Sequence, residues 1–462
     1  MKDLTQGSIT RTIVAMATPV AAGMIFQTLY LLVDLYFVAA LGDDAVAGVG
    51  AGGTLLFVIM ALTQILGVSA VALISQAVGR RNQEEANEVF NQSLVISLVF
   101  AAFTLVGGYL MATAYMTSIA SDQGAVDEGV TFLRWFLPGM ALQFPLIAMA
   151  SSLRATGLVK PGMVVQVATV VLNTALAPIL IAGWGPGPAL GVLGAGLASS
   201  ISIAVGVLML IYYFIKLEKY VSFESHLWKP RFALWGRMVN IGLPAGGEML
   251  VLFIYFSAVY WLIQDFGASA QAGFSIGGRI MQSIFMPTMA IAFALGPIAG
   301  QNYGAGRFDR VRETSSKGIL LSTVVMVVVT VLMQWKSDLL VGYFTTEAEV
   351  IEVGSVFLQL ISLNFIAQGI VFSCSGMFQG LGNTRPALVS SFIRLLVFLP
   401  FSVYLKYQPG FTINQVWYMS IAAVTVQAVV SYVLLQREFR KRLGRAAPPA
   451  DGDGLDSTVS QP

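Results

Sequence analysis

Twelve apolar segments, each long enough to cross a lipid bilayer as a helix, constrain this chain more than any other feature of its sequence. A bilayer core of about 30 Å needs roughly 20 apolar residues in helical form. The twelve segments lie at residues 13–41, 52–75, 92–116, 131–152, 161–183, 190–215, 239–264, 274–298, 317–342, 354–376, 386–406 and 415–437. Only 11% of the residues are charged, less than half of the roughly 25% that a soluble domain carries. The sequence therefore predicts an all-α polytopic membrane protein with 12 transmembrane helices.

The positions of Lys and Arg predict how these helices are oriented. If the N-terminus is cytoplasmic, all but five of the 26 basic residues lie on the cytoplasmic side. The five are Arg134, Lys336 and Lys406 on the opposite side, and Arg279 and Arg394 inside spans. Such an excess of basic residues marks the cytoplasmic side. We expect a multi-pass protein of the plasma membrane, which is the inner membrane in a bacterium, with both termini cytoplasmic. A net charge of +2 gives no basic footprint for nucleic acid.

An internal repeat relates the two halves of the chain at an offset of 225 residues. It pairs Pro19 with Pro244, Gly42 with Gly267, Gly48 with Gly273, Gln76 with Gln301, Gly79 with Gly304, Gly157 with Gly382 and Pro161 with Pro386. Because Gly and Pro restrict backbone geometry, the halves are expected to share one helix path. Each half holds six spans, so the repeats are parallel, which is typical of transporters.

This repeat predicts a division of the chain into four parts. Two six-helix lobes are expected, at residues 1–215 and 239–437, joined by a cytoplasmic loop at residues 216–238. A cytoplasmic tail at residues 438–462 is expected to be disordered from its composition.

Two of the 24 acidic residues, Asp34 and Glu248, lie well inside predicted spans. A carboxylate there is costly, which favours a functional site. Asp34 is our candidate proton or cation site, and the alternative is a structural Asp held by backbone or hydroxyl groups. Gln27 and Tyr30 share a helical face with Asp34 and are candidate cavity residues.

Pro19 interrupts the same span as Asp34 and is a candidate hinge. A proline inside a helix removes one backbone hydrogen bond and bends the helix. A static kink is the alternative, because a bend alone does not require motion.

Several motifs together resemble the multidrug and toxic compound extrusion (MATE) transporters, in their NorM-like and DinF-like branches. The resemblance rests on Pro19 and Asp34 of the first span and on four segments: the Leu-Gly-Asp-Asp-Ala-Val-Ala-Gly sequence at 41–48, Gln76 with Gly79, Gln-Asn-Tyr-Gly at 301–304 and Gln-Gly-Leu-Gly-Asn-Thr-Arg-Pro at 379–386. It covers nearly the whole chain. It implies two six-helix lobes, alternating access, and drug export driven by inward flow of H⁺ or Na⁺.

The resemblance also implies roles for individual residues. Asn173 matches an Asn near the coupling Asp, while Ala177 and Ala195 stand where some relatives have oxygen ligands. A hard cation needs several oxygens, so a proton is favoured over Na⁺, although Na⁺ at Asp34 stays open. Glu248 and Gln271 match polar residues of the NorM-like C-terminal lobe and are assigned to the substrate cavity. Glu248 has an alternative, structural role as partner of Arg279.

We therefore expect a secondary active antiporter, in which Asp34 couples the export of amphipathic or cationic drugs to H⁺ or Na⁺. Its partners are small molecules and membrane lipids, and it is expected to act as a monomer without a cofactor or bound metal. The alternative within transport is a flippase for lipid-linked oligosaccharides. An intramembrane enzyme would need a convergent nucleophile and base or metal ligands, which two acids in opposite halves do not supply.

Overall fold

The computed structural model describes residues 1–120, 122–184 and 187–444, and for residues 28–35 it describes the backbone only. All regular elements in these ranges are helical, with two short 3₁₀ turns, η1 (Ser225–Trp228) and η2 (Gln264–Phe266). The α-helices are α1 (Ile9–Ala39), α2 (Asp43–Gly53), α3 (Leu55–Gly79), α4 (Gln83–Ile119), α5 (Gln123–Ala155), α6 (Lys160–Ala182), α7 (Val192–Lys216), α8 (Phe232–Ile263), α9 (Ala268–Gly304), α10 (Phe308–Gly342), α11 (Ala348–Ser362), α12 (Phe365–Leu381), α13 (Arg385–Lys406) and α14 (Ile413–Leu443).

Eleven helical stretches of the described chain are long and apolar enough to cross a membrane, and the bent pair α11 and α12 provides a twelfth. Helices α2 and α3 together form one of the eleven. The prediction of an all-α polytopic protein with 12 spans is confirmed.

The predicted span at residues 354–376 differs from the others because it is two helices, bent by 57° at the break between α11 and α12. Side chains of α10 hold the break open. Thr330 donates to the carbonyl of Ser362 at 3.0 Å, and the Gln334 amide donates to the carbonyl of Gln359 at 2.7 Å. These carbonyls would otherwise accept bonds within one continuous helix, and side chains that take such acceptors bend helices.

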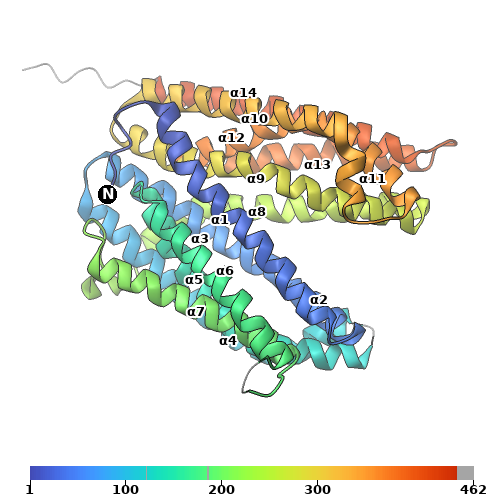
Figure 1. Cartoon of the computed structure of the whole chain (residues 1–462). Helices are drawn as coiled ribbons and strands as arrows, with labels where there is room; N and C mark the ends of the chain where they lie inside the picture. The colour runs from blue at the N-terminus through green and yellow to red at the C-terminus, as the bar shows by residue number, and fades with distance from the viewer. Residues whose placement is uncertain (121, 185–186, 445–462) are drawn as a thin grey trace, which may run out of the picture.

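The helices form two groups, α2–α7 and α8–α14, that lie close at one end and separate toward the other (Figure 1). Helix α3 packs against α8 and α9 and joins the groups. The repeat is visible in the backbone: Gly157 and Gly382, which follow α5 and α12, have φ of +81° and +71°. Only glycine adopts this left-handed region without strain, which explains why the repeat preserves it there.

Helix α1 belongs to both groups and departs from the predicted boundary of the first lobe. It packs along α6 in the first group and α9 in the second. Ile9, Ile13 and Met16 are buried in one apolar cluster with residues of α9, α12 and α14. Their spacing puts them on one helical face, so the first turns of α1 pack with the second half of the chain, whereas the predicted lobe 1–215 includes them in the first.

Two other predicted segments are shorter than expected. The inter-lobe loop, predicted at 216–238, ends where α8 begins at Phe232. Residues 438–443 of the predicted tail continue α14, in which Phe439 and Leu443 are buried and Arg442 donates to the carbonyl of Leu381 at 2.7 Å. Apolar contacts thus extend the helix past the membrane span, and residues 445–462 of the predicted tail lie outside the described residues.

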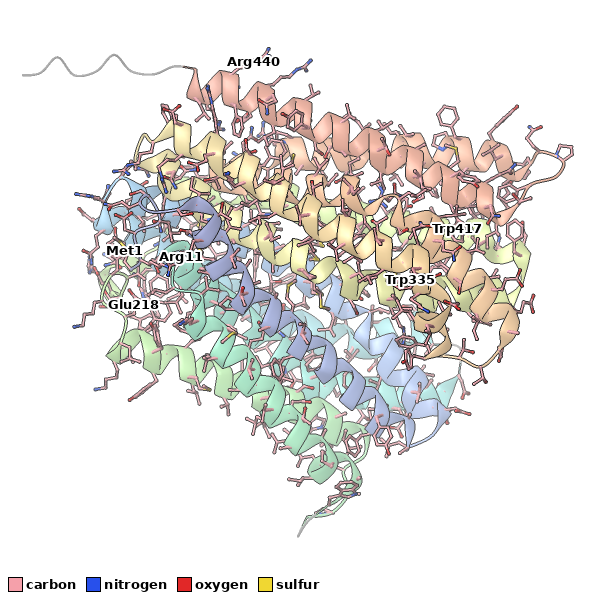
Figure 2. All side chains as sticks on the ribbon, turned by 45° about the horizontal axis from the view of Figure 1, so that its top comes forward. Met1, Arg11, Glu218, Trp335, Trp417 and Arg440 are labelled. Atoms are coloured by element: carbon pink, nitrogen blue, oxygen red, sulfur yellow. The ribbon has the colours of Figure 1, made fainter. Side chains whose placement is uncertain are left out.

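One end of the helix bundle carries many of the basic residues and is called the basic end below. It includes the N-terminal segment (residues 1–8), the α3–α4 turn (residues 80–82) and the α9–α10 turn (residues 305–307). In Figure 2, Met1, Arg11 and Glu218 lie at this end, and Trp335 and Trp417 lie toward the other.

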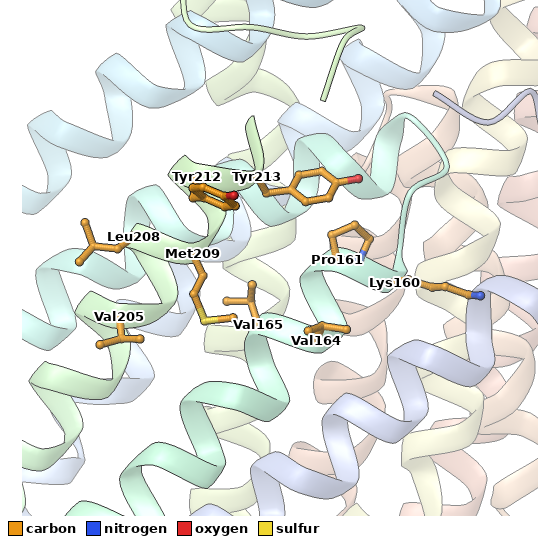
Figure 3. A pocket seen from close by; sticks show the side chains of 9 residues that line it. All are labelled: Lys160, Pro161, Val164, Val165, Val205, Leu208, Met209, Tyr212 and Tyr213. Carbon is orange, nitrogen blue, oxygen red and sulfur yellow. The ribbon is translucent and has the colours of Figure 1, made fainter. Parts of the chain in front are cut away.

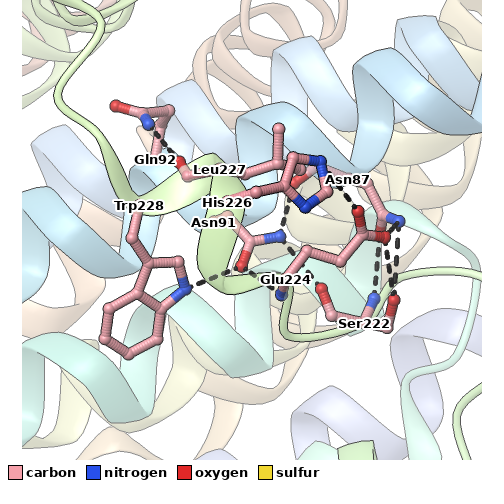
Figure 4. A network of polar contacts seen from close by, with 8 residues as sticks. All are labelled: Asn87, Asn91, Gln92, Ser222, Glu224, His226, Leu227 and Trp228. Carbon is pink, nitrogen blue, oxygen red and sulfur yellow. Dashed lines mark hydrogen bonds and ion pairs between the residues drawn. The ribbon is translucent and has the colours of Figure 1, made fainter.

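The loop between the two halves is fastened to α4 by a network of polar contacts (Figure 4). Asn91, which is fully buried, donates to the carbonyls of Asn87 and Ser222, each at 2.9 Å. Its side-chain oxygen accepts from the backbone N–H of Glu224 and from the Trp228 indole, each at 3.0 Å. Asn91 is therefore a structural residue that positions the loop.

Replacing Asn91 with alanine is expected to destabilise the protein by about 2 kcal/mol, because buried loop groups lose their hydrogen-bond partners. The measurement is the midpoint of thermal unfolding in detergent. The same substitution at Asn240, which is exposed, serves as the control and should leave the midpoint nearly unchanged. Equal midpoints for both variants would contradict the structural role of Asn91.

Candidate functional site

Asp34 and Tyr30, the main residues of the predicted coupling site, have side chains outside those that the structure describes. Their backbone is helical and lies within α1, which runs without interruption from Ile9 to Ala39. Their predicted roles therefore stay predictions, and the surroundings supply the geometry that bears on them.

Asn173 lies on α6, is fully buried, and donates from Nδ2 to the Ser199 hydroxyl of α7 at 3.3 Å. Ala177 and Ala195, one turn from Asn173 and Ser199 respectively, are also buried. Sequence reasoning missed Ser199. Its spacing of four residues from Ala195 could have identified it, because residues one turn apart share a helical face.

Helices α1 and α6 run in the same direction and pack along each other. The Gln27 side chain accepts a hydrogen bond from the Gln166 side chain of α6 at 3.0 Å; Gln27 is exposed and Gln166 is partly buried. Two helical turns further, α1 reaches residue 34 and α6 reaches Asn173. Because both helices rise 1.5 Å per residue, the backbone of residue 34 lies at about the height of Asn173.

Glu248 lies in the middle of α8 and is held by hydroxyl groups from other helices of the second half. Its carboxylate accepts from Ser375 of α12 and from Ser391 of α13, each at 3.4 Å. The buried Gln427 of α14 donates to the Ser391 hydroxyl at 3.0 Å. Four helices thus converge on one carboxylate. These serines could not be identified from the sequence, because serine is common within the spans.

The two arginines inside predicted spans do not neutralise Glu248 among the described residues. No ion pair there joins Glu248 to Arg279, which is exposed. The Arg394 guanidinium lies 3.9 Å from the centre of the Tyr255 ring. That stacking attracts a cation to the ring face and gives Arg394 a packing role in the second half.

Gln271 and Pro19 lie apart from these carboxyl and amide clusters. Gln271 is in the first turn of α9, at the end of the bundle opposite the N-terminus, and no described hydrogen bond joins it to Glu248. Pro19 lies inside α1. The structure therefore does not bring the predicted cavity residues Gln27, Glu248 and Gln271 into one contact network.

At the basic end the backbones of the two halves approach each other closely in two contacts that the internal repeat relates. A Cβ atom on Gly79 would lie less than 3.0 Å from the carbonyl oxygen of Gln301, and a Cβ on Gly304 would lie equally close to that of Gln76. The offset of 225 residues exchanges the two contacts. The paired glycines found in the sequence thus let α3 and α9 cross at short range.

The two glutamines of this crossing tie each half to the other. The Gln76 amide donates to the carbonyl of Gly380 in the second half, and the Gln301 amide donates to that of Ala155 in the first, each at 2.9 Å. These bonds are also exchanged by the repeat offset. We call Gln76, Gly79, Gln301 and Gly304 the basic-end seam.

The N-terminal segment crosses this seam and contacts both halves. The backbone N–H of Lys2 donates to the carbonyl of Thr156 in the first half at 2.8 Å. That of Leu4 donates to the side-chain oxygen of Gln301 in the second half at 3.0 Å, and the Asn302 amide donates to the Leu4 carbonyl. The segment therefore adds bonds that favour closure of the basic end.

A groove of about 610 Å³ lies between α6 and α7, with apolar side chains along it and Lys160 near one end (Figure 3). None of the predicted site residues lines this groove. Among the described residues, no group of three or more His, Cys, Asp or Glu side chains could hold a metal ion.

Comparison with known proteins identifies the family. The MatE family profile matches residues 19–179 and again residues 244–404, two stretches separated by the repeat offset. The chain is 24% identical over 440 residues to "Probable multidrug resistance protein YoeA" of Bacillus subtilis, covering 94% of this chain and 95% of that protein. It is 25% identical over 426 residues to "Multidrug export protein MepA" of Staphylococcus aureus, covering 91% and 92%.

Solved structures show the same fold. A MATE transporter in complex with MaL6 has a TM-score of 0.90 at 23% identity, covering 96% of this chain and 99% of that one. A transporter described as a multidrug resistance MATE family member of the MOP superfamily, in an outward-facing conformation, has a TM-score of 0.88 at 24% identity, covering 95% and 98%. The fold predicted from sequence is thereby confirmed. The family match confirms the prediction that the chain is a transporter rather than an enzyme. The chain belongs to the MatE family of multidrug efflux transporters, whose substrates are small molecules and which need no cofactor.

Proposed function

We propose that this protein exports amphipathic or cationic compounds by alternating access in exchange for H⁺, with Asp34 as the coupling residue. The observation that carries the proposal is the common height of residue 34 and the buried Asn173 on the parallel helices α1 and α6. A carboxylate at this position loses its charge when it binds a proton. The free energy of proton binding depends on how far water is excluded from the carboxylate and on the polar groups around it. Relatives named for multidrug resistance and multidrug export support the substrate class.

A proton is favoured over Na⁺ by the chemistry around Asn173. Ala177 lies one helical turn from Asn173 on α6, and Ala195 lies one turn from Ser199 on α7. Neither alanine has a side-chain oxygen. Ser199 adds one hydroxyl oxygen, whereas a hard cation such as Na⁺ binds through several oxygens. A single carboxylate with one amide and one hydroxyl nearby suits proton binding.

The second carboxylate, Glu248, is proposed to respond to substrate in the C-terminal lobe. Three polar side chains, Ser375, Ser391 and Gln427, surround it directly or through one hydroxyl. Protonation of Glu248 would change which of these groups donates. We retain Gln27, Tyr30 and Gln271 as proposed cavity residues and Pro19 as the proposed hinge of α1.

The basic-end seam supports an alternating-access mechanism. Its contacts close one end of the bundle, while the two helix groups separate toward the other end (Figure 1). We place the basic end in the cytoplasm, with both termini on that side, because basic residues mark it. The conformation in this structure is then open to the outside of the cell. We propose that the protein lies in the plasma membrane, which is the inner membrane in a bacterium. One chain carries both proposed lobes, so a monomer suffices.

The coupling ion is tested by measuring efflux of a cationic dye at a fixed pH gradient, with and without Na⁺. Efflux is expected to follow the inward proton gradient and to be unchanged when Na⁺ is removed, because Ala177 and Ala195 supply no side-chain oxygen one turn from Asn173 and Ser199. Reversal of the gradient at constant Na⁺ serves as the control. Efflux that requires Na⁺ and ignores the pH gradient would contradict proton coupling.

A further inference from the structure

A polar pocket of about 580 Å³ lies at the basic end, directly over the seam. It is formed where the N-terminal segment meets the α3–α4 turn of the first half and the α9–α10 turn of the second. Gly79, Gln301 and Gly304 of the seam line its inner wall. Since a water molecule occupies about 30 Å³, the pocket has room for a polyatomic ligand, and its walls belong to both halves.

The charge of the pocket is predominantly positive. Arg80 and Arg81 line it from the first half and Arg307 from the second, against one acid, Asp3. The Asp3 carboxylate accepts bonds from the Thr5 hydroxyl at 2.6 Å and from the Thr5 N–H at 2.8 Å. The hydroxyl bond, together with the nearby arginines, holds the pKa of Asp3 below its usual value. Asp3 is thus ionised and engaged by Thr5.

Most donors of the three guanidinium groups remain available within the described part of the chain. Arg80 pairs with Glu85 at 2.9 Å, and Arg307 donates to the carbonyl of Thr5 at 2.8 Å. No described hydrogen bond or ion pair involves the guanidinium of Arg81, whose backbone N–H donates to the carbonyl of Val78. Each guanidinium has five N–H donors, and their planar arrangement matches the oxygens of a phosphate.

The backbone of Arg81 has a conformation that is strained for a residue with a side chain. Its φ is +59°, and it is the one residue other than glycine with positive φ in the described chain. Its repeat partner is Gly306, with φ of +71°. Glycine suits this left-handed conformation, whereas other residues are strained in it. The first half thus carries an arginine at a turn where the second half uses the unstrained residue.

We propose that this pocket binds a phosphate-type anion, which bridges the α3–α4 and α9–α10 turns and holds the basic end closed. Separation of the halves at the seam would pull Arg80 and Arg81 away from Arg307. The anion would then bind the closed state more tightly than the open one and shift the population toward it. A free phosphate compound and the headgroup of an anionic lipid share this chemistry.

The binding test uses the full-length protein in phosphatidylcholine nanodiscs, titrated with inorganic pyrophosphate by calorimetry. Arg81→Gly removes one guanidinium while supplying the residue that the backbone conformation favours, so the fold should be preserved. Loss of one charge-assisted contact should weaken binding about tenfold. The control Arg312→Gln removes one charge from an exposed position outside the pocket and should bind like the wild type.

A second arm reports the state of the seam. Spin labels at Glu84→Cys and Asp309→Cys, which are repeat partners in the first turns of α4 and α10, measure the distance between the halves in a Cys374→Ala background. Pyrophosphate in phosphatidylcholine, or phosphatidylglycerol nanodiscs without pyrophosphate, should increase the short-distance population. A response to pyrophosphate alone identifies a free anion, and a response to phosphatidylglycerol alone identifies a lipid headgroup.

Two results would overturn the proposal. One is the absence of binding and of a distance change with both probes. The other is an equal response of the Arg81→Gly and Arg312→Gln variants, because it would assign any effect to general surface charge rather than to the pocket.

Discussion

Cells that carry the Asp34→Asn variant are expected to export cationic drugs no faster than cells without the protein. Asparagine keeps the size and hydrogen-bonding capacity of the side chain but cannot release or take up a proton in the physiological range. If Asp34 couples the two fluxes, loss of its titration removes the link between the ion gradient and the transport cycle. The measurement is the rate of dye efflux, normalised to the amount of protein in the membrane.

The Glu248→Gln variant is the matched comparison, because it makes the same chemical change in the other half. Glu248 is held by Ser375 and Ser391, and the amide of a glutamine keeps hydrogen bonds to both hydroxyls. We expect a partial loss that differs between substrates, in keeping with a cavity role. Full export by Asp34→Asn would refute the assigned coupling residue.

Replacing Gly79 with leucine is expected to abolish transport by preventing closure of the basic end. The new side chain would overlap the backbone of α9 near Gln301, which cannot move aside as a flexible side chain does. Overpacking of this kind costs about 3 kcal/mol or more. A difference of that size changes the ratio of closed to open protein about 100-fold. Spin labels on the two halves should then report a widened basic end.

Two further leucine substitutions make this prediction specific. Gly304→Leu places the same clash at the repeat-related position against Gln76, and it should produce the same loss of transport. Gly107→Leu, on α4, introduces the side chain where nothing lies within 4 Å of the added Cβ, and it should transport normally. Normal transport by Gly79→Leu would show that the seam does not close during the cycle.

The sequence predicted much of the fold because its strongest signals act locally. Spans follow from apolar length, and the repeat follows from Gly and Pro at fixed offset. The pairing of Gly79 with Gly304 was visible in the sequence, but their shared crossing was not, because a repeat records backbone path rather than distance. The half of the chain against which the first turns of α1 pack could likewise not be predicted. The apolar face formed by Ile9, Ile13 and Met16 would fit either half equally well.

The candidate site was less accessible to sequence reasoning for a physical reason. Charged residues inside a span are rare and identify themselves by their cost, which is how Asp34 and Glu248 were found. Hydroxyl side chains are common in spans and usually bond to their own helix, as Ser202 does to the carbonyl of Ala198. Nothing in the sequence separates such a serine from Ser375 or Ser391, which contact Glu248. Tertiary packing decides between them.

The most direct test of the antiport mechanism is the proton flux that accompanies drug movement. In proteoliposomes with an imposed pH gradient and no Na⁺, addition of a cationic drug should accelerate decay of the gradient. The rate should depend on drug concentration, and Asp34→Asn should abolish the acceleration while Gly107→Leu retains it. Drug that crosses the membrane through the wild-type protein without any change in the pH gradient would contradict proton-coupled antiport.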